Sequence, residues 1–216
     1  MKPYKTVLVR AEDEFIINKS RFIGHAAPCQ TEEQALAFIA EMRQLYKDAS
    51  HNCYAYVLGQ NKGIMRYSDD GEPGGTAGLP MMEVLKNRDV TDLCVVVTRY
   101  FGGILLGAGG LVRAYTQGAV VALNAAHVAV MHPSQTYLLE IDYSQLGRLE
   151  HWIKDTPYRL DDREFAAAVT CQITLKAEQA DDFTAEIARL FDGRYEPVLI
   201  EERFMAWEEG EQPAQE

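Results

Sequence analysis

The residues best suited to chemistry gather in two glycine-rich segments of the N-terminal half. The first, residues 68–78, places four glycines and three carboxylates directly before a predicted helix. Backbone amides at Gly74 and Gly75 would be open to a ligand, and amides at a helix N-terminus attract anions. The carboxylates of Asp69, Asp70 and Glu72 have the opposite preference, for a divalent cation or a cationic side chain. A tight connection whose acids cap the helix is the structural alternative.

The second segment, residues 99–115, joins a predicted buried strand to a helix of small residues. Strand, glycine loop and helix is the general plan of phosphate-binding loops, but no Gly-Lys-Ser/Thr closes this one, and the glycine spacing differs from the dinucleotide fingerprint. Arg99 ends the strand and Arg113 lies in the predicted first helical turn, so we expect Arg113 to meet a carboxylate of the first segment or an external phosphate. The aromatic residues Tyr100, Phe101 and Tyr115 would either stack on bases or pack in the core.

Two smaller clusters precede strands: Lys19-Ser20-Arg21-Phe22 and His51-Asn52-Cys53. A catalytic pair of His51 and Cys53 is conceivable, but no orienting acid is evident. The candidate ligand-binding residues are therefore Arg21, His51, Asn52, Asp69, Asp70, Glu72, Gly74, Gly75, Arg99, Gly102, Gly103, Gly107, Gly109, Gly110 and Arg113. No catalytic residue and no cofactor is predicted, and Asp69, Asp70 and Glu72 are the only metal-ligand candidates.

Hydrophobic periodicity predicts the elements that position these segments. We expect strands at 5–10, 14–17, 22–28, 53–59, 64–68 and 93–98, and a short strand at 128–131. Helices are predicted at 32–47, 76–87 and 111–125, the first beginning at a capping box of Thr31 and Gln34. Residues 101–110 are expected to be loop.

A linker is predicted at His132-Pro133-Ser134, which divides the chain into residues 1–133 and 134–205. The later part follows the order strand, helix, strand, strand, helix, strand, which is the ferredoxin-like βαββαβ plan. Residues 206–216 are expected to form a disordered acidic tail. The predicted fold class is therefore α+β.

Charge and cysteine content restrict the partners. Residues 1–133 hold 13 basic and 13 acidic residues, whereas residues 134–216 hold 8 and 19, so the whole net charge of −11 lies in the later part. RNA contact would fall to the first part, and the acidic part would meet a basic protein surface or serve solubility. Four scattered cysteines favour buried free thiols in a reducing compartment. Neither a signal peptide nor a membrane span is expected, so the predicted location is the cytoplasm.

At four motifs the chain resembles the IMPACT family, in its bacterial two-domain form. The motifs are Lys19 to Ile23, Ser50 to Tyr56, Ser68 to Gly78 and Arg99 to Tyr115. The resemblance implies an N-terminal domain similar to domain 2 of ribosomal protein S5, an α/β sandwich, followed by a ferredoxin-like domain similar to one in elongation factor G. For the eukaryotic members it implies translational control through a partner protein.

Three hypotheses follow from these patterns. The leading one is a translation-associated binding protein that contacts RNA, the ribosome or a protein through its N-terminal domain, with Lys62 and Arg66 among the nearby cations. The second is a metal-dependent enzyme acting on a phosphorylated small molecule or nucleotide. The third is a protein-interaction scaffold that uses the acidic C-terminal domain.

Overall fold

The first half of the chain is built on a five-stranded sheet in which every neighbouring pair is antiparallel. The computed structural model describes residues 2–207. The strand order is β2-β3-β6-β4-β5, from β2 (Ala11–Ile17), β3 (Ser20–Pro28), β6 (Leu93–Tyr100), β4 (His51–Leu58) and β5 (Ile64–Ser68). The central strand β6 is buried on both faces as far as Arg99, as its run of valines predicts.

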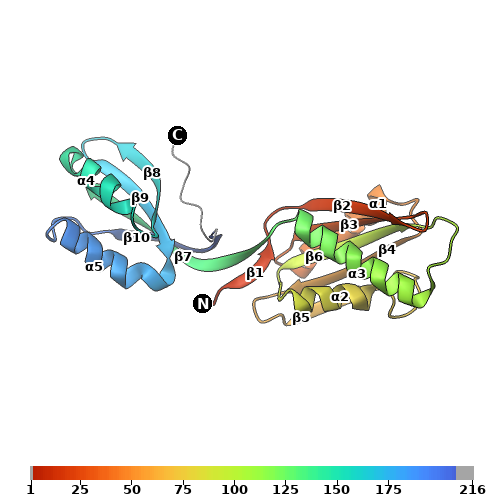
Figure 1. The fold of residues 1–216 in the computed structure, drawn as a ribbon. Coiled ribbons are helices and arrows are strands. Elements are labelled where there is room, and N and C mark those ends of the chain that lie inside the picture. Colours follow the sequence, from red (N-terminus) through yellow and green to blue (C-terminus); the bar gives the residue numbers. More distant parts are fainter. Residues whose placement is uncertain (1, 208–216) are drawn as a thin grey trace. The chain divides into compact units, whose positions relative to one another are not determined.

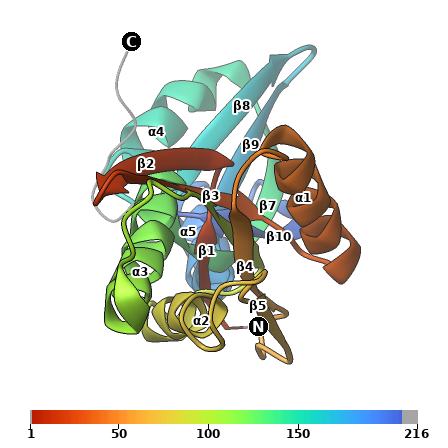
Figure 2. The same cartoon turned by 90° about the vertical axis from the view of Figure 1, so that its right-hand side faces the viewer.

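Helices cover both faces of this sheet. On one face, α2 (Gly78–Asn87) and α3 (Gly107–Ala125) pack against Cys53, Ala55, Val95 and Val97. On the other, α1 (Glu32–Leu45) packs against Tyr56, Cys94 and Val96. Figure 2 shows α1 on one side of the sheet and α2 and α3 on the other. These elements, with β1 (Tyr4–Val7), form a compact unit over Tyr4–Val130.

Two glycines allow α3 to lie directly on the sheet. A Cβ at Gly24 would stand 2.2 Å from the carbonyl oxygen of Gly118, and one at Gly118 would stand 2.8 Å from a methyl group of Val97. Any larger residue at either position would push the helix away from β3 and β6. This close approach fixes where α3 begins, and therefore where the second glycine-rich segment lies.

The second compact unit begins at Met131 and has the predicted βαββαβ order. In its sheet, β7 pairs antiparallel with both β10 and β9, and β9 pairs antiparallel with β8; the same sheet also includes β1, which pairs with β7. The elements are β7 (Val128–Ile141), α4 (Tyr143–Ile153), β8 (Arg159–Phe165), β9 (Val169–Lys176), the short 3₁₀ helix η1 (Ala177–Gln179), α5 (Ala180–Leu190) and β10 (Val198–Ala206) (Figure 1). The α+β fold class, with its ferredoxin-like second part, is confirmed.

Three local expectations are wrong. The expected linker at 132–134 lies inside β7, which runs unbroken from Val128 to Ile141. Gly107, Gly109 and Gly110 belong to the first turn of α3, because glycine costs a helix only about 1 kcal/mol and does not prevent one. Ala206 ends β10 and the Trp207 indole donates to Ser134, so the ordered chain extends past 205. The rest of the predicted tail, 208–216, lies outside the described residues.

Candidate functional site

Asp69 organises the first glycine-rich segment from within. Its Oδ2 accepts a hydrogen bond from the amide of Gly75 at 2.8 Å, and its Oδ1 accepts from the amides of Ala77 at 3.0 Å and Gly78 at 2.8 Å. These amides lie at and before the start of α2, where no residue of the helix itself provides a cap. Asp69 therefore caps α2 across an eight-residue loop.

Asp70 joins the same segment to β4 and α1. Its Oδ2 accepts from the amide of Asn52 at 2.7 Å, and its Oδ1 accepts from Nη2 of Arg43 at 2.7 Å. Its carbonyl oxygen lies 2.8 Å from Nδ1 of His51, and because a carbonyl only accepts, that nitrogen carries the proton. Asp70 adopts a left-handed conformation with φ 45°, which Asp tolerates better than most residues.

Glu72 and Arg99 form a buried ion pair between the two glycine-rich segments. Oε1 of Glu72 accepts from Nη1 of Arg99 at 2.6 Å and from the hydroxyl of Tyr115 at 2.7 Å, and the two charged side chains are 3% and 5% exposed. Nε2 of His51 lies 3.9 Å from the same oxygen. Nε of Arg99 is buried and has no hydrogen-bond partner among the described residues. Glu72 of the first segment and Arg99 of the second thus meet inside the domain.

The neighbouring thiol is held in its neutral form. Sγ of Cys53 donates to the carbonyl oxygen of Asp69 at 3.0 Å, and burial raises the pKa of the Cys53 thiol well above its usual range. Burial also raises the pKa of the Tyr115 hydroxyl, with Cys53 and Glu72 adding to the effect. Since His51 and Cys53 have separate backbone partners, the geometry gives no support to a nucleophile and base pair.

The carboxylates do not form a metal centre. Asp69 is occupied by amides, Asp70 by an amide and a guanidinium, and Glu72 by Arg99 and Tyr115. Within residues 2–207 no group of three or more His, Cys, Asp or Glu side chains is arranged to hold a metal ion. These three carboxylates therefore give no support to the hypothesis of a metal-dependent enzyme.

The second glycine-rich segment faces outward. Phe101, Ile104 and Leu105 are 47%, 43% and 85% exposed, which is unusual for three apolar side chains in five residues. A Cβ at Gly102 would stand 2.1 Å from the backbone of Lys19, so this segment packs closely on the turn between β2 and β3. Figure 1 shows that turn and the connection into α3 at the same end of the unit.

We name this region the tip surface and define it by five exposed residues: Lys19, Phe101, Ile104, Leu105 and Arg113. Arg113 lies in the second turn of α3, and neither it nor Lys19 forms an ion pair with a described residue. The expected contact between Arg113 and a carboxylate of the first segment is therefore not seen. α3 begins with no side-chain cap and no acid in its first turn, which leaves its N-terminal amides without a counter-charge.

Four of the predicted glycines border open space. A Cβ at Gly74, Gly75, Gly103 or Gly107 would meet no atom within 4 Å. The last three have positive φ, so their conformation rather than crowding requires glycine. Gly109 lies in α3 beside the Arg113 guanidinium, and Gly110 packs on Leu106.

The other predicted cations are not gathered at the tip surface. Arg21 forms an ion pair with Glu14 and lies over the Tyr100 ring. Lys62 forms an ion pair with Asp89, and the exposed Arg66 donates to the backbone of Met65. Of the aromatic residues, Tyr115 packs in the core and Phe101 is exposed.

Two residues that the sequence pattern did not indicate complete the site. Oγ of Ser20 accepts from the amide of Gly102 at 3.1 Å and lies 3.5 Å from Nη2 of Arg99. Arg43 reaches Asp70 from α1. Ser20 lies in the Lys19 to Phe22 motif, so the sequence could have indicated it as a site residue. The Arg43 contact depends on tertiary packing, which no sequence motif indicates.

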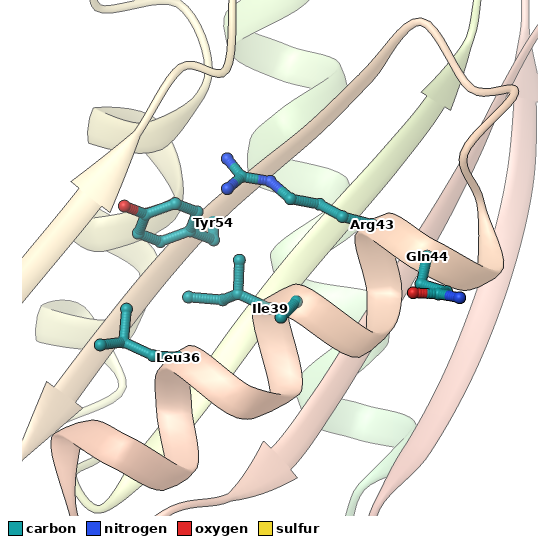
Figure 3. Close-up of a pocket in the computed structure, with 6 residues that line it drawn as sticks. Leu36, Ile39, Arg43, Gln44 and Tyr54 are labelled. Atoms are coloured by element: carbon teal, nitrogen blue, oxygen red, sulfur yellow. The ribbon is translucent and has the colours of Figure 1, made fainter.

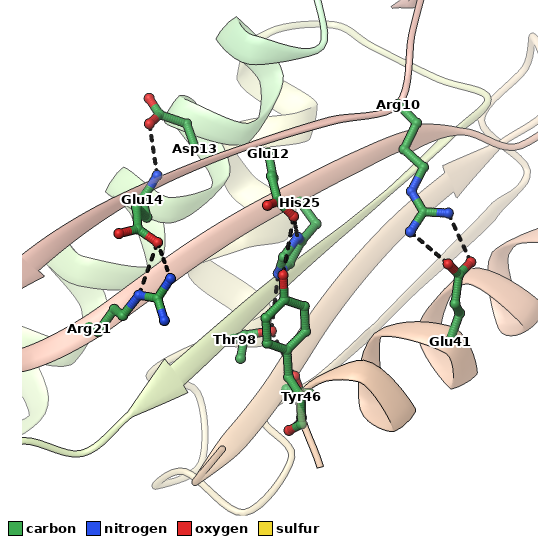
Figure 4. Close-up of polar contacts among 10 residues, drawn as sticks. Arg10, Glu12, Asp13, Glu14, Arg21, His25, Glu41, Tyr46 and Thr98 are labelled. Atoms are coloured by element: carbon green, nitrogen blue, oxygen red, sulfur yellow. Dashed lines mark hydrogen bonds and ion pairs between the residues drawn. The ribbon is translucent and has the colours of Figure 1, made fainter. Parts of the chain in front are cut away.

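A buried polar chain crosses the sheet beside this site (Figure 4). Nδ1 of His25 lies 2.9 Å from Oε2 of Glu12, and Nε2 lies 3.2 Å from the hydroxyl of Thr98, which donates to Oδ1 of Asn52 at 2.7 Å. The Tyr46 hydroxyl donates to the same Glu12 oxygen. Burial lowers the pKa of His25, opposed by Glu12. The predicted Asn52 is therefore a buried structural link.

A groove of about 420 Å³ runs between α1 and β4 on the opposite face of the sheet (Figure 3). Leu36, Ile39 and Arg43 line it from the helix, and Tyr54 lines it from the strand. Arg43 lies over the Tyr54 ring while pairing with Asp70. The groove includes none of the predicted glycines.

Comparison with known proteins gives matches to both halves of the chain. Residues 18–123 match the Impact N-terminal domain, and residues 139–194 match a domain of unknown function, DUF1949. No helix within residues 2–207 has the length and apolar character needed to cross a membrane.

Full-length and partial relatives carry the same family name. The chain is 40% identical to IMPACT family member YvyE of Bacillus subtilis, covering 88% of each chain. It is 37% identical to IMPACT family member YigZ of Escherichia coli, covering 86% of this chain and 92% of that one. Protein IMPACT of Xenopus laevis is 36% identical over 41% of this chain and 30% of its own length.

A solved structure described as a crystal structure of an hypothetical protein is 34% identical, with a TM-score of 0.59 over 93% of this chain and 98% of that chain. The two domain matches, the shared identity over most of the chain and the shared fold agree with one another, and the chain belongs to the IMPACT family.

Proposed function

We propose that this protein is a translation-associated binding protein whose first unit contacts RNA, free or in the ribosome, through the tip surface. The family match is the coarse support, since the eukaryotic members that the chain resembles are linked to translational control. A cytoplasmic location belongs to the same proposal.

The observation that carries the proposal is the composition of the tip surface. It combines two cations without described ion-pair partners, Lys19 and Arg113, with an aromatic ring at Phe101 and an almost fully exposed Leu105. Cations neutralise phosphates and aromatic faces stack on bases, and these are the two contacts that single-stranded regions of RNA offer.

The internal pairing described above supports this choice of surface. The carboxylates of Asp69, Asp70 and Glu72 already accept hydrogen bonds from nearby amides, from Arg43 and from Arg99. The second segment, from Phe101 to the start of α3, presents three large apolar side chains to solvent. The carboxylate segment therefore has a structural role beside the tip surface, through the contact of Glu72 with Arg99, and is not proposed to contact RNA.

The test is a filter-binding titration with a structured RNA that has single-stranded loops, at several salt concentrations. We expect Lys19→Ala with Arg113→Ala to weaken binding and to flatten the plot of log affinity against log salt, by about one unit of slope for each lost phosphate contact. Phe101→Ala should weaken binding by roughly tenfold or more without changing that slope, because stacking is worth about 1–3 kcal/mol per base.

Lys86→Ala with Arg88→Ala is the matched control, because it removes the same charge from the far end of α2. Equal losses in the two double variants would show that net charge alone, and not the tip surface, governs binding. The proposal would be refuted if the affinity for RNA did not change with salt concentration. Ribosome or protein binding lost on Leu105→Ser but unaffected by salt would indicate a protein contact at the same surface.

The proposed role of the acidic C-terminal part as a protein-binding region stays a prediction. A deletion of residues 135–216 would cut through β7 and is therefore a poor test of this role. Charge reversal at exposed acids such as Glu164 and Glu201 is a cleaner test, because it leaves the strands intact.

A further inference from the structure

The sheet of the second unit has one face that its helices do not cover. α4 and α5 pack on the face that carries Leu139, Ile141 and Ile173. The opposite face carries Ser134, Thr136 and Thr174, whose hydroxyls include a direct contact of 2.9 Å between the two threonines. Although no helix covers this polar face, Ser134, Thr136 and Thr174 are each only 0–2% exposed.

Strand register places three cations on the same polar face, one of them Arg203, which is the partner of Ser134 across the β7–β10 pair. Lys176 is the direct partner of Ser134 across the β7–β9 pair, and Arg159 is the partner of Thr174 across β8–β9. Directly opposed residues of an antiparallel pair point to the same side of the sheet. An ion pair with Asp161 at 3.3 Å positions the Arg159 guanidinium.

The ring of Trp207 lies between these groups. Its indole Nε1 donates to Oγ of Ser134 at 2.9 Å, and the ring centroid is 5.6 Å from the Arg159 guanidinium carbon and 5.8 Å from Nζ of Lys176. Cations within about 6 Å of an indole face are attracted by its quadrupole. Three strands therefore contribute to one ring contact.

We propose that Ser134, Arg159 and Lys176 form an aromatic-ring site, whose resident ligand is the chain's own Trp207 and which accepts a planar ring bearing an N–H in its place. The site holds the end of the chain against the polar face of the sheet. When Trp207 leaves, that face becomes available.

The hydroxyl of Ser134 explains the preference for an N–H. Its proton is directed to the carbonyl oxygen of His132 at 3.0 Å, so Oγ presents only lone pairs to the ring. A ring without a donor would leave this nearly buried oxygen without the bond it makes now. The cations add affinity for an electron-rich ring but do not select its polar edge.

The first test follows Trp207 in the intact chain. The chain has two tryptophans, so Trp152→Phe leaves Trp207 as the sole emitter. We expect Trp207 emission to be blue-shifted and shielded from acrylamide, and Ser134→Ala to shift it to the red and raise the quenching constant. Emission and quenching equal to those of N-acetyltryptophanamide, before and after Ser134→Ala, would overturn the proposal.

The second test fills the site from solution. Trp207→Ala should lower the Tm, and free indole at millimolar concentrations should restore part of that loss. 1-Methylindole, which lacks the N–H, should bind roughly threefold to tenfold more weakly, the range expected for one hydrogen bond. Equal effects of the two compounds would refute the role of Ser134, and no Tm shift with indole would refute the site. Trp207→Phe with the same compounds serves if the alanine variant does not fold.

Discussion

Replacing Arg99 by methionine provides the sharpest test of how the two glycine-rich segments support each other. The substitution keeps the volume of the side chain but leaves the Glu72 carboxylate buried with only the Tyr115 hydroxyl as a close donor. Removing one partner of a buried ion pair typically costs about 3–5 kcal/mol, because the remaining charge is left in a medium that solvates it poorly. At about 2–4 °C per kcal/mol for a chain of this size, Tm should fall by roughly 6–20 °C.

The assay is urea unfolding for the free energy and thermal unfolding for Tm, both followed by circular dichroism, with an apolar replacement as the internal comparison. Glu72→Leu, Arg99→Met and Tyr115→Phe together remove both charges and the hydroxyl that would lose its acceptor. This triple variant should be more stable than the Arg99→Met variant, because apolar replacement of a buried pair is often close to neutral. Glu14→Gln, which removes one partner of the exposed pair with Arg21, is the surface control.

Two results would refute the reasoning. One is a loss of stability in Arg99→Met no larger than that in Glu14→Gln, since the ion pair would then not be buried in solution. The other is a triple variant that loses as much as the sum of its single changes, since the groups would then not act on one another.

Gly24→Ala should reduce the free energy of unfolding by about 1–3 kcal/mol in the same urea titration, because its Cβ would clash with a backbone oxygen of α3. Gly147→Ala, at an exposed position of α4 with open space around it, should raise that free energy by about 0.5–1 kcal/mol. Burial holds the pKa of His25 below 6.5, so the unfolded chain binds more protons than the folded chain. The free energy of unfolding should therefore fall as the pH drops from about 6.5 toward the folded-state pKa. An NMR titration that gives a His25 pKa above 6.5, or a Glu12→Gln variant in which this pKa falls no further, would contradict the prediction. The neutral Cys53 thiol should react with a disulfide reagent at pH 8 only after unfolding, and fast labelling of the native protein at this residue would be the opposite result.

The second unit shows what hydrophobic periodicity can predict. Its six main elements follow the predicted order, and the pattern is clearest in β7 and β9, which alternate, and in α4 and α5, which bury one side. The boundary was the weak point. Pro133 indicated a linker, yet it lies in β7 at a position that pairs with Phe204 of β10, one residue before the β9 pairing begins at Ser134. Proline has no backbone N–H to donate, but it can lie in a strand where that donor is not needed by a neighbouring strand.

The candidate site stays a prediction, and the contacts of its residues depend on distances that the sequence does not contain. Spacing placed Asp69 before a helix, and capping was the alternative stated for it. The contacts of Glu72 with Arg99, 27 residues away, and with Tyr115, 43 residues away, needed the sheet. The exposure of Leu105 could not be foreseen, because an apolar residue in a loop has no period that reveals its direction.

The cap that Asp69 provides also bears on local unfolding at the start of α2. To release the amides of Gly75, Ala77 and Gly78, the chain must give up three hydrogen bonds to one carboxylate at once. Their hydrogen exchange should therefore be slow and should follow a single cooperative opening, although this segment lies at the surface. The amides of residues 103–105 have no hydrogen-bond acceptor among the described contacts, whereas the amide of Gly102 donates to Ser20. Amides 103–105 should therefore exchange fast, beside the slowly exchanging amides that Asp69 holds.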